Sequence, residues 1–343
     1  MSESPVYEYK SRLMAKFDSS KLKRIGVYTS GGDAPGMNAA VRAVVRVGIH
    51  EKLEVFTVTS GYSGMIAGEI KAVDRGSMAN IIQRGGTVIK TGRSAEFMKP
   101  EGRAKAAAHL KKHGIEALVC IGGDGSFKGA QALWDEHKIP AIGVPGTIDN
   151  DVHGTDVTIG FDTAVNTALN AIDKIRDTAA SHDRLFIVEV MGRNSGFIAL
   201  NVGLAGGAED VFIPESNTTV DDAIKHIQRG LARGKMSSIL VAAEAQKEGR
   251  AYDLAESIRK KSGFEAKVCI LGHIQRGGSP TANDRILASR LGAAAVHGLK
   301  KGLCDVMAGV INEQVVYTPL EETYMKHKTV RKELVTLLQI LSQ

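Results

Sequence analysis

The chain has 343 residues, which is enough for two domains or for one large α/β unit. Its hydrophobic content of 43% and charged content of 24% are those of an ordinary soluble globular protein. The sequence has no run of eighteen apolar residues to span a membrane and no basic tract with interleaved aromatics to bind nucleic acid. Its net charge of +6 favours anionic small molecules as partners.

The cellular location is predicted from two features. The first twenty residues are polar and lack the apolar stretch of a secretory signal. The cysteines at positions 120, 269 and 304 lie far apart and have no metal-ligand spacing. An odd, sparse set of cysteines fits a reducing cytoplasm. Because Cys120 and Cys269 lie in apolar strand-like runs, we expect both to be buried.

Strand-like and helix-like segments alternate along the chain after an extension over residues 1–20, where a short surface helix over 7–17 is one alternative. The predicted strands are 24–30, 53–60, 117–121, 139–144, 185–190, 211–213, 238–243 and 267–271. The predicted helices are 39–46, 127–137, 163–181, 220–233 and 252–261. This alternation predicts a parallel sheet covered by helices on both faces.

Three of the predicted strands end in loops that contain glycine and acidic residues, over 31–38, 122–126 and 145–151. In open α/β sheets the ligand crevice lies at the carboxyl ends of the strands. Glycines let the backbone approach phosphates, and carboxylates hold Mg²⁺ or take a proton. One such loop alone could be a tight turn, but three together indicate phosphoryl transfer from a nucleotide to a hydroxyl.

Five motifs carry a resemblance to a known family. They are TSGGDAPGMN over 29–38, IGGDGS over 121–126, PGTIDND over 145–151, VEVMGR over 188–193 and LGHIQRGG over 271–278. From about residue 23 to about residue 314 the chain resembles the ATP-dependent 6-phosphofructokinases of bacterial type. The resemblance implies transfer of the ATP γ-phosphoryl group to the 1-hydroxyl of fructose 6-phosphate, giving fructose 1,6-bisphosphate and ADP in glycolysis.

The same resemblance implies an α/β fold of two Rossmann-like three-layer αβα domains, with mainly parallel sheets and the active site in the cleft between them. The expected ATP-binding domain is 21–160 plus 275–325. The expected sugar-phosphate domain is 161–274 plus 326–343. The resemblance also implies a homotetramer in the cytoplasm, with no membrane or nucleic-acid partner.

Site residues follow by resemblance at matching positions. The ATP side comprises Gly31, Tyr62, Arg93, Asp124, Gly125 and Ser126, with Asp124 linked to Mg²⁺. Asp149 is the expected general base, Arg193 the cation on the transferring phosphoryl group, and Thr147 and Asp151 the flanking catalytic residues. The remaining substrate contacts are Arg184, Met191, Glu244, Lys267, His273 and Arg276.

Two parts of the resemblance go beyond a single copy of the chain. Arg184 and Lys267 match positions that reach the sugar phosphate across a subunit interface, and Lys267 stands where arginine is usual. Lysine keeps the charge but loses the bidentate fork.

The expected effector site comprises Arg42, Arg46, Arg75, Arg176, Glu209, Arg233 and Lys235. For Arg42 and Arg46, four apart on one helix face, a solvated basic face is the alternative.

Alternatives of other kinds remain at this stage. Pyrophosphate-dependent relatives typically place an acidic residue at the position of Gly125 and a lysine at that of Gly146, whereas this chain has glycine at both. A non-catalytic, nucleotide-sensing regulatory homologue predicts loss of Asp149 or Arg193, and both are present. A Rossmann dehydrogenase needs a G-x-G-x-x-G turn, which the first loop does not fit.

Overall fold

The computed structural model describes residues 16–180, 185–235, 237–244 and 248–342. The chain divides into two compact units, each formed by separate stretches of sequence. Unit 1 comprises Met1–Thr147, Val152–Ile159 and Pro280–His327; unit 2 comprises Ile148–Asp151, Gly160–Ser279 and Lys328–Gln343. The predicted domain bounds place 148–151 and 275–279 in the first domain, whereas the contacts group both segments with unit 2.

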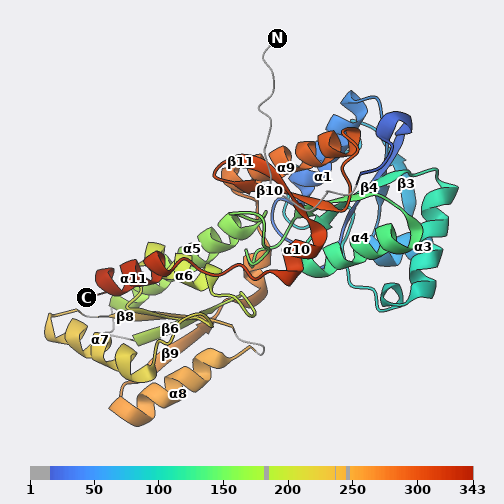
Figure 1. Cartoon of the computed structure of the whole chain (residues 1–343). Helices are drawn as coiled ribbons and strands as arrows, with labels where there is room; N and C mark the ends of the chain where they lie inside the picture. The colour runs from blue at the N-terminus through green and yellow to red at the C-terminus, as the bar shows by residue number, and fades with distance from the viewer. Residues whose placement is uncertain (1–15, 181–184, 236, 245–247, 343) are drawn as a thin grey trace. The chain divides into compact units, whose positions relative to one another are not determined.

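Unit 1 contains a seven-stranded sheet of order β11-β10-β5-β4-β1-β2-β3. Its strands are β1 Arg24–Thr29, β2 Glu54–Val58, β3 Ile70–Val73, β4 Ala117–Gly122, β5 Ala141–Pro145, β10 Val306–Ile311 and β11 Gln314–Pro319. The five inner strands are parallel, and only the edge strands β3 and β11 pair antiparallel. The last two strands, orange to red in Figure 1, thus return to a sheet built mostly from the first half of the chain.

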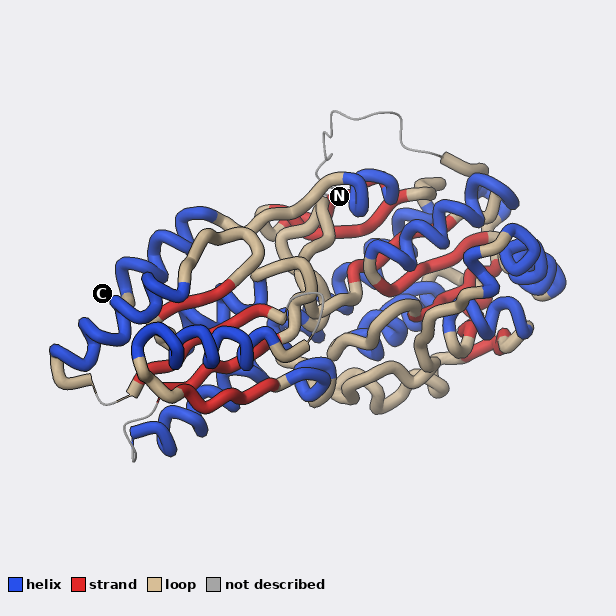
Figure 2. The backbone as a smooth tube through the Cα atoms, turned by 90° about the horizontal axis from the view of Figure 1, so that it is seen from below, coloured by secondary structure: helices blue, strands red, loops and turns tan. Residues whose placement is uncertain are grey.

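Helices cover both faces of this sheet (Figure 2). They are α1 Met37–His50, α2 Gly61–Ala67, α3 Pro100–Lys112, α4 Asp124–His137, α9 Ala282–Lys300 and α10 Leu320–Met325, with 3-10 turns η1 Ser19–Lys21 and η2 Glu96–Met98. α1 packs along α9, while α2, α3, α4 and α10 contribute to a separate hydrophobic cluster. All six residues of β4 are buried, as its continuous apolar sequence predicts for an inner parallel strand.

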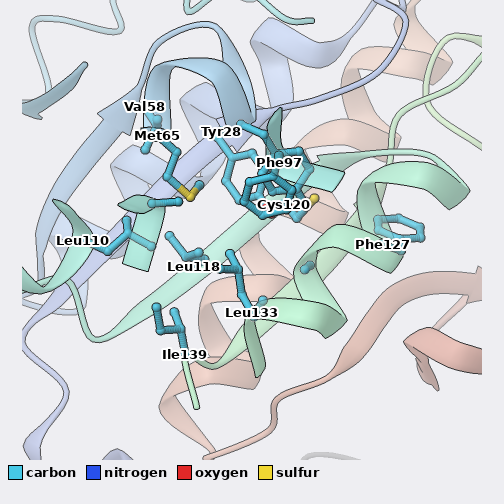
Figure 3. Packing of buried hydrophobic residues seen from close by; sticks show 14 of the residues in the cluster. Tyr28, Val58, Met65, Phe97, Leu110, Leu118, Cys120, Phe127, Leu133 and Ile139 are labelled. Carbon is cyan, nitrogen blue, oxygen red and sulfur yellow. Dashed lines mark hydrogen bonds between the residues drawn. The ribbon is translucent and has the colours of Figure 1, made fainter. Parts of the chain in front are cut away.

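The hydrophobic cluster on the α2, α3 and α4 side contains the aromatic residues drawn in Figure 3. Tyr62 stacks on Phe97 with ring centroids 3.9 Å apart, and the ring of Tyr28 lies 5.1 Å from that of Tyr62. Aliphatic side chains such as Leu118 and Leu133 lie beside these rings in the same cluster. Close aromatic packing of this kind makes the base of the nearby loops rigid.

Unit 2 contains a four-stranded parallel sheet of order β7-β8-β6-β9. Its strands are β6 Leu185–Val190, β7 Asp210–Phe212, β8 Ser238–Ala243 and β9 Ala266–Ile270. Its helices are α5 Phe161–Ala180, α6 Phe197–Gly206, α7 Val220–Ala232, α8 Arg250–Ser262 and α11 Lys332–Leu341, with the 3-10 turn η3 Gly272–Arg276. Alternate strand residues such as Ile187 and Leu240 pack on α7 and α8, and Val211 meets Gly203 of α6. The predicted three-layer αβα arrangement with mainly parallel sheets is confirmed.

Two sequence predictions need correction, and a third concerns membrane helices. Cys120 is buried, but Cys269 is only partly buried because it lies on the edge strand β9. Most of the alternative helix over 7–17 falls outside the described residues. Its last two residues are not helical: Lys16 forms a β-bridge with Leu303, and the Phe17 N–H donates to the Gly302 carbonyl. No described helix is long and apolar enough to cross a membrane.

Asp305 is a half-buried carboxylic acid at the start of β10. Burial, followed by the negative charges of Asp135 and Glu321, raises the pKa of Asp305 from 3.8 to about 7. The native state therefore holds a proton that the unfolded state releases between about pH 4 and pH 7. Stability gained from this group is fully present below that window and is lost as the pH rises through it.

We predict that Asp305→Asn is more stable than the wild type at pH 8 and equal to it near pH 4. The backbone at Asp305 is left-handed, with φ of +56°, and asparagine tolerates this conformation as well as aspartate does. After allowance for partial solvent exposure, the expected gain is on the order of 1 kcal/mol, or roughly 2–4 °C in melting temperature. Thermal melts from pH 4 to pH 8 measure it. A difference that grows toward acid pH would contradict the prediction.

Asp74→Asn is the matched control of opposite sign. Hydrogen bonds from the Ser77 side chain and backbone lower the pKa of Asp74, so its ionised form is the one that the fold prefers. Its stabilising contribution is present at neutral pH and is lost as the pH falls through its lowered pKa. This variant should be less stable than the wild type at neutral pH.

Candidate active site

The three predicted glycine and acid loops begin side by side at one edge of the sheet of unit 1. They follow β1, β4 and β5, which are neighbours in the sheet. The Ser30 N–H donates to the Ile121 carbonyl at 3.0 Å, and the Gly146 N–H donates to the Gly122 carbonyl at 2.9 Å. Strand order therefore brings together three loops that are far apart in the sequence, at the sheet edge where α/β proteins bind ligands.

Two glycines shape the contact between the first two loops. Gly31 has φ of +86°, and a Cβ there would lie 3.4 Å from the Ser126 hydroxyl oxygen. At Gly122 a Cβ would lie 2.5 Å from the Ser30 carbonyl oxygen, so any larger residue would force the loops apart. The backbone of both loops can thus approach closely, as a phosphate-binding turn requires.

Helix α4 begins inside the second loop, with Asp124 as its first residue. Gly125 is exposed, and a Cβ at that position would meet nothing within 4 Å. The backbone N–H groups of a first helical turn attract anions. Open space at Gly125 beside an exposed helix start leaves room for a phosphate-bearing ligand, and the half-buried Asp124 adds a carboxylate to the same turn.

Tyr62 contacts this loop from the hydrophobic core of unit 1 and not from the exposed surface. Its ring is only 5% exposed, and its hydroxyl donates to the Ser126 carbonyl at 2.5 Å. Burial raises the pKa of Tyr62 well above its ordinary value, so the hydroxyl keeps its proton and remains a donor. Arg93 is exposed, and it follows Gly92, whose carbonyl accepts from the Gly31 N–H at 3.4 Å.

Thr147 lies close to the second loop. It is the last residue of the third loop that belongs to unit 1. A Cβ at Gly123 would lie 3.8 Å from the Thr147 Cβ. The Thr158 hydroxyl donates to the Thr147 carbonyl at 2.6 Å and fixes its backbone. The structure thus brings Thr147 together with the loop that carries Asp124, all within unit 1.

A buried carboxylate and two arginines form the centre of the site residues in unit 2. Asp149 is 6% exposed. Burial raises the pKa of Asp149, while the nearby positive charges of Arg276 and Arg193 lower it. The Asp149 carbonyl accepts a hydrogen bond from the Ser195 hydroxyl at 3.1 Å. Arg193 is exposed and has φ of +51°, a strained backbone conformation that is common at functional sites.

Glu244 joins the same group from the end of β8. It is 7% exposed, and its Oε1 accepts from the Arg193 N–H at 3.3 Å. Burial is the main cause that raises the pKa of Glu244, and the charge of Asp149 raises it further. The structure therefore places Asp149, Arg193, Glu244 and Arg276 within one electrostatic cluster.

The sequence analysis missed Gln275 as a structural part of this site. Gln275 is fully buried, its Oε1 accepts from the Met191 N–H at 2.8 Å, and its Nε2 donates to the Ala164 carbonyl at 3.4 Å. It thereby joins the β6–α6 loop, α5 and η3. A polar side chain beside Arg276 in the LGHIQRGG motif was the available signal, but its burial and partners depend on tertiary structure.

The other predicted substrate residues lie at the edge of unit 2. His273 is exposed in η3, and Lys267 is exposed on the edge strand β9. Asp151 is half-buried at the end of the third loop. Arg184 lies outside the described residues.

The predicted effector residues are divided between the two units. In unit 1, Arg42 and Arg46 are close enough on α1 for their charges to repel: burial lowers the pKa of Arg42, and Arg46 lowers it further. In unit 2, the buried Glu209 pairs with Lys235, and the Arg176 guanidinium donates to the Gly206 carbonyl at 3.1 Å. Two further residues, Arg75 and Arg233, are exposed.

Glycine loops at a helix start in one unit, and a buried carboxylate under the influence of two arginines in the other, are features of an α/β phosphotransferase. The chain belongs to the phosphofructokinase family, whose sequence profile, described as Phosphofructokinase, matches residues 24–299. An ATP-dependent 6-phosphofructokinase from Thermus thermophilus is 57% identical over 321 residues, which cover 94% of this chain and 100% of that relative.

Solved structures agree with the family assignment. Phosphofructokinase from Saccharomyces cerevisiae superposes with a TM-score of 0.82 at 37% identity over 93% of this chain. This chain spans about half of that longer yeast chain, 47%. A pyrophosphate-dependent phosphofructokinase from Marinobacter aquaeolei gives a TM-score of 0.78 at 21% identity, over 92% of this chain and 91% of its own. That likeness shows the shared fold alone.

Proposed function

We propose that the chain phosphorylates fructose 6-phosphate at its 1-hydroxyl with ATP, giving fructose 1,6-bisphosphate and ADP in glycolysis. The observation that carries this proposal is the buried Asp149, placed within the electrostatic influence of Arg193 and Arg276. A sugar hydroxyl needs a base, and a phosphorylated sugar needs cations. The relative at 57% identity is named for the same reaction.

In this proposal Asp149 accepts the proton of the sugar hydroxyl as it attacks. Burial raises the pKa of Asp149 and makes its carboxylate a stronger base, while the two arginines keep the ionised form populated at neutral pH. Arg193 stabilises the charge on the transferring phosphoryl group, because a guanidinium fork matches phosphate oxygens. Thr147 and Asp151 flank the base and position the reacting groups.

The proposed metal is Mg²⁺, held by Asp124 together with phosphate oxygens of the nucleotide. Among the described residues, no group of three His, Cys, Asp or Glu side chains is arranged to hold a metal. Mg²⁺ in kinases is commonly bound by one or two carboxylates and by the substrate phosphates, so one carboxylate at the start of α4 fits it. When bound, the ion neutralises charge on the phosphates.

The donor is the part of the function that a direct assay settles. Pyrophosphate is the alternative, and the open space beside Gly125 supports the larger nucleotide. Purified protein is incubated with fructose 6-phosphate, a divalent cation and either ATP or pyrophosphate, and fructose 1,6-bisphosphate is measured. Turnover with ATP but not pyrophosphate supports the proposal. Turnover with pyrophosphate alone overturns the donor, and none with either supports the regulatory alternative.

We further propose a cytoplasmic homotetramer in which Lys267 and Arg184 of one copy contact the sugar phosphate bound by another. Lys267→Ala should raise the KM for fructose 6-phosphate about ten- to a hundred-fold, because a charged phosphate contact is worth roughly 1.5–3 kcal/mol. The KM for ATP should stay within about twofold. Lys267→Arg should be neutral or better. Lys260→Ala is the control, since Lys260 is an exposed lysine of α8 that pairs with Glu256 four residues earlier.

A mixing experiment tests whether the site is shared. Subunits carrying Lys267→Ala are reassembled with subunits carrying His273→Ala. If each site takes Lys267 from one copy and His273 from another, some sites in the hybrids carry neither change. Activity should then rise above that of both parents. Well-mixed hybrids without regained activity, or a fully active monomer, would count against a shared site.

The predicted effector residues support a proposal of regulation by a small anion, a phosphorylated one or a polycarboxylate. Arg42 and Arg46 concentrate positive charge on α1, and Lys235 holds Glu209 in the other unit. Initial rates with ADP, phosphoenolpyruvate and citrate measure the response. Rates that none of the three changes, at subsaturating fructose 6-phosphate, would contradict regulation by these ligands.

A further inference from the structure

Lys328 lies outside all five sequence motifs, but its side chain contacts a residue of the motif over 145–151. Its Nζ donates to the Asn150 Oδ1 at 2.9 Å, across 178 positions of sequence. The same Nζ lies 5.0 Å from the centroid of the Phe197 ring, which is within range of a cation–π interaction. Lys328 is half-buried, so both contacts are partly shielded from water. The lysine head group is thus held from two sides.

Asn150 follows the proposed base, Asp149, directly in the chain. It is 4% exposed and has φ of +55°. Most residues are strained in this left-handed conformation, although asparagine tolerates it better than most. Because the turn at Asn150 sets the direction of the chain on both sides, its conformation also sets where the Asp149 carboxylate points. A fixed Asn150 side chain helps to keep that turn.

A second contact, made by Ser195, fixes the backbone of Asp149 itself. The Ser195 hydroxyl donates to the Asp149 carbonyl at 3.1 Å and also to the Gly192 carbonyl at 3.1 Å. Phe197 begins α6, two residues after Ser195. Lys328 therefore contacts both the turn after the base and the helix that follows the loop carrying Arg193.

The position of Lys328 in the chain adds to its importance. Residues 148–151 form a short excursion of the chain into unit 2, between stretches that belong to unit 1. Lys328 is the first residue of the final segment to enter unit 2. The hydrogen bond between Lys328 and Asn150 therefore joins two of the points at which the chain enters this unit, and one of them carries Asp149.

We propose that Lys328 is a positioning residue: it holds Asn150 in its left-handed turn and so orients Asp149 for proton transfer. This inference rests on the proposed function for its catalytic consequence. Its structural consequence, an ordered turn over 148–151, does not depend on activity. Lys328 itself takes no part in the chemistry, so its loss should affect turnover more than substrate binding.

The test compares Lys328→Met with the wild type. Methionine keeps much of the length of the side chain and its packing on Phe197, but it cannot donate to Asn150. We expect kcat to fall about tenfold, with the KM values for ATP and fructose 6-phosphate within about twofold. Lys328→Arg, which restores a donor and the positive charge, should recover most of kcat. Lys326→Met is the control, because Lys326 is exposed and pairs with Glu322 on α10.

A double-mutant cycle separates positioning from general destabilisation. Glycine adopts positive φ without a side chain to hold, so Asn150→Gly removes the partner of Lys328 while it allows the turn. If Lys328 acts through Asn150, Lys328→Met should lower kcat much less in the Asn150→Gly background than in the wild type. Equal losses in both backgrounds would overturn the proposed route.

Amide hydrogen exchange of peptides that cover 148–152 gives a readout without turnover. Lys328→Met should exchange faster there than the wild type, while peptides from β4 stay unchanged. Unchanged exchange over 148–152 would overturn the inference, whether or not the enzyme is active. Faster exchange with unchanged kcat would overturn the catalytic role of this contact. A wild-type protein that does not phosphorylate fructose 6-phosphate would instead overturn the proposed function, and exchange would still decide whether Lys328 orders the turn.

Discussion

Asp149→Asn is expected to lower kcat by about 10² to 10⁴, the range that general base catalysis typically contributes. Asparagine keeps the size of the side chain in its buried position but cannot accept the proton of a sugar hydroxyl. Arg193 and Arg276, whose charges act on Asp149, remain in place, and both are proposed to bind the anionic substrate. The KM for fructose 6-phosphate should therefore change far less than kcat.

The pH dependence of kcat provides a second readout. Burial raises the pKa of Asp149 above 3.8, against the opposing effect of the two arginines. In the wild type, kcat should fall as the pH drops through this raised pKa, because the protonated acid is no base. The residual activity of Asp149→Asn should lack this acid limb.

Asp305→Asn is the matched control for this prediction. It makes the same substitution at another carboxyl group whose pKa burial raises, in unit 1 and outside the proposed site. Its kcat should equal that of the wild type. An Asp149→Asn enzyme that keeps more than about a tenth of the wild-type kcat would refute the assignment of the base.

The sequence alone predicted the arrangement of the three loops because their strands are short, apolar and buried. The strand over 117–121, observed as β4 Ala117–Gly122, has no exposed residue, so its pattern is continuous. Strands of this kind are inner and parallel, and their carboxyl ends meet at one sheet edge. The chemistry then follows from the residue types within each loop, which are adjacent in the sequence.

The two antiparallel edge strands of unit 1 lack such a pattern. β3 Ile70–Val73 and β11 Gln314–Pro319 are partly exposed and pair antiparallel, so neither has a continuous apolar run. α6 Phe197–Gly206 is apolar on nearly all sides and has no amphipathic pattern to mark it as a helix. Cys269 was predicted buried because local sequence does not reveal that β9 is an edge strand.

Long-range contacts that complete the site have no local signal either. Gln275 meets Met191 and Ala164 only because η3, the β6–α6 loop and α5 pack together. Lys328 meets Asn150 from the C-terminal segment. Tyr62 was expected on the ATP side, and its ring proves to be part of the hydrophobic core with its hydroxyl on the Ser126 carbonyl. Whether it also touches nucleotide stays a prediction.

Gly125→Asp is expected to raise the KM for ATP at least tenfold, with a much smaller change in the KM for fructose 6-phosphate. The new carboxylate would stand in the first turn of α4, next to Asp124, where the nucleotide phosphates are proposed to bind. The negative charge of the new carboxylate would repel the phosphates, and the side chain would occupy space that is now open. Because that space is open, the fold should tolerate the change.

Gly125→Ala is the control for backbone effects, since a Cβ at this position meets nothing within 4 Å. Its KM for ATP should stay near that of the wild type. Gly146 is a poorer site for the same test, because a Cβ there would lie 3.0 Å from Ile121 Cγ2 and 3.1 Å from Met37 Cε. Substitution at Gly146 would disturb core packing as well as the nucleotide space, so a loss of activity would be ambiguous.

Initial rates of Gly125→Asp over a range of ATP concentrations, and with pyrophosphate in its place, complete the test. Gain of pyrophosphate use is not required, because other contacts of the donor also matter. Melting temperatures close to the wild-type value would show that the variant is folded. A folded Gly125→Asp enzyme with an unchanged KM for ATP would mean that the nucleotide does not bind against the first turn of α4, and the proposed position of the donor would be wrong.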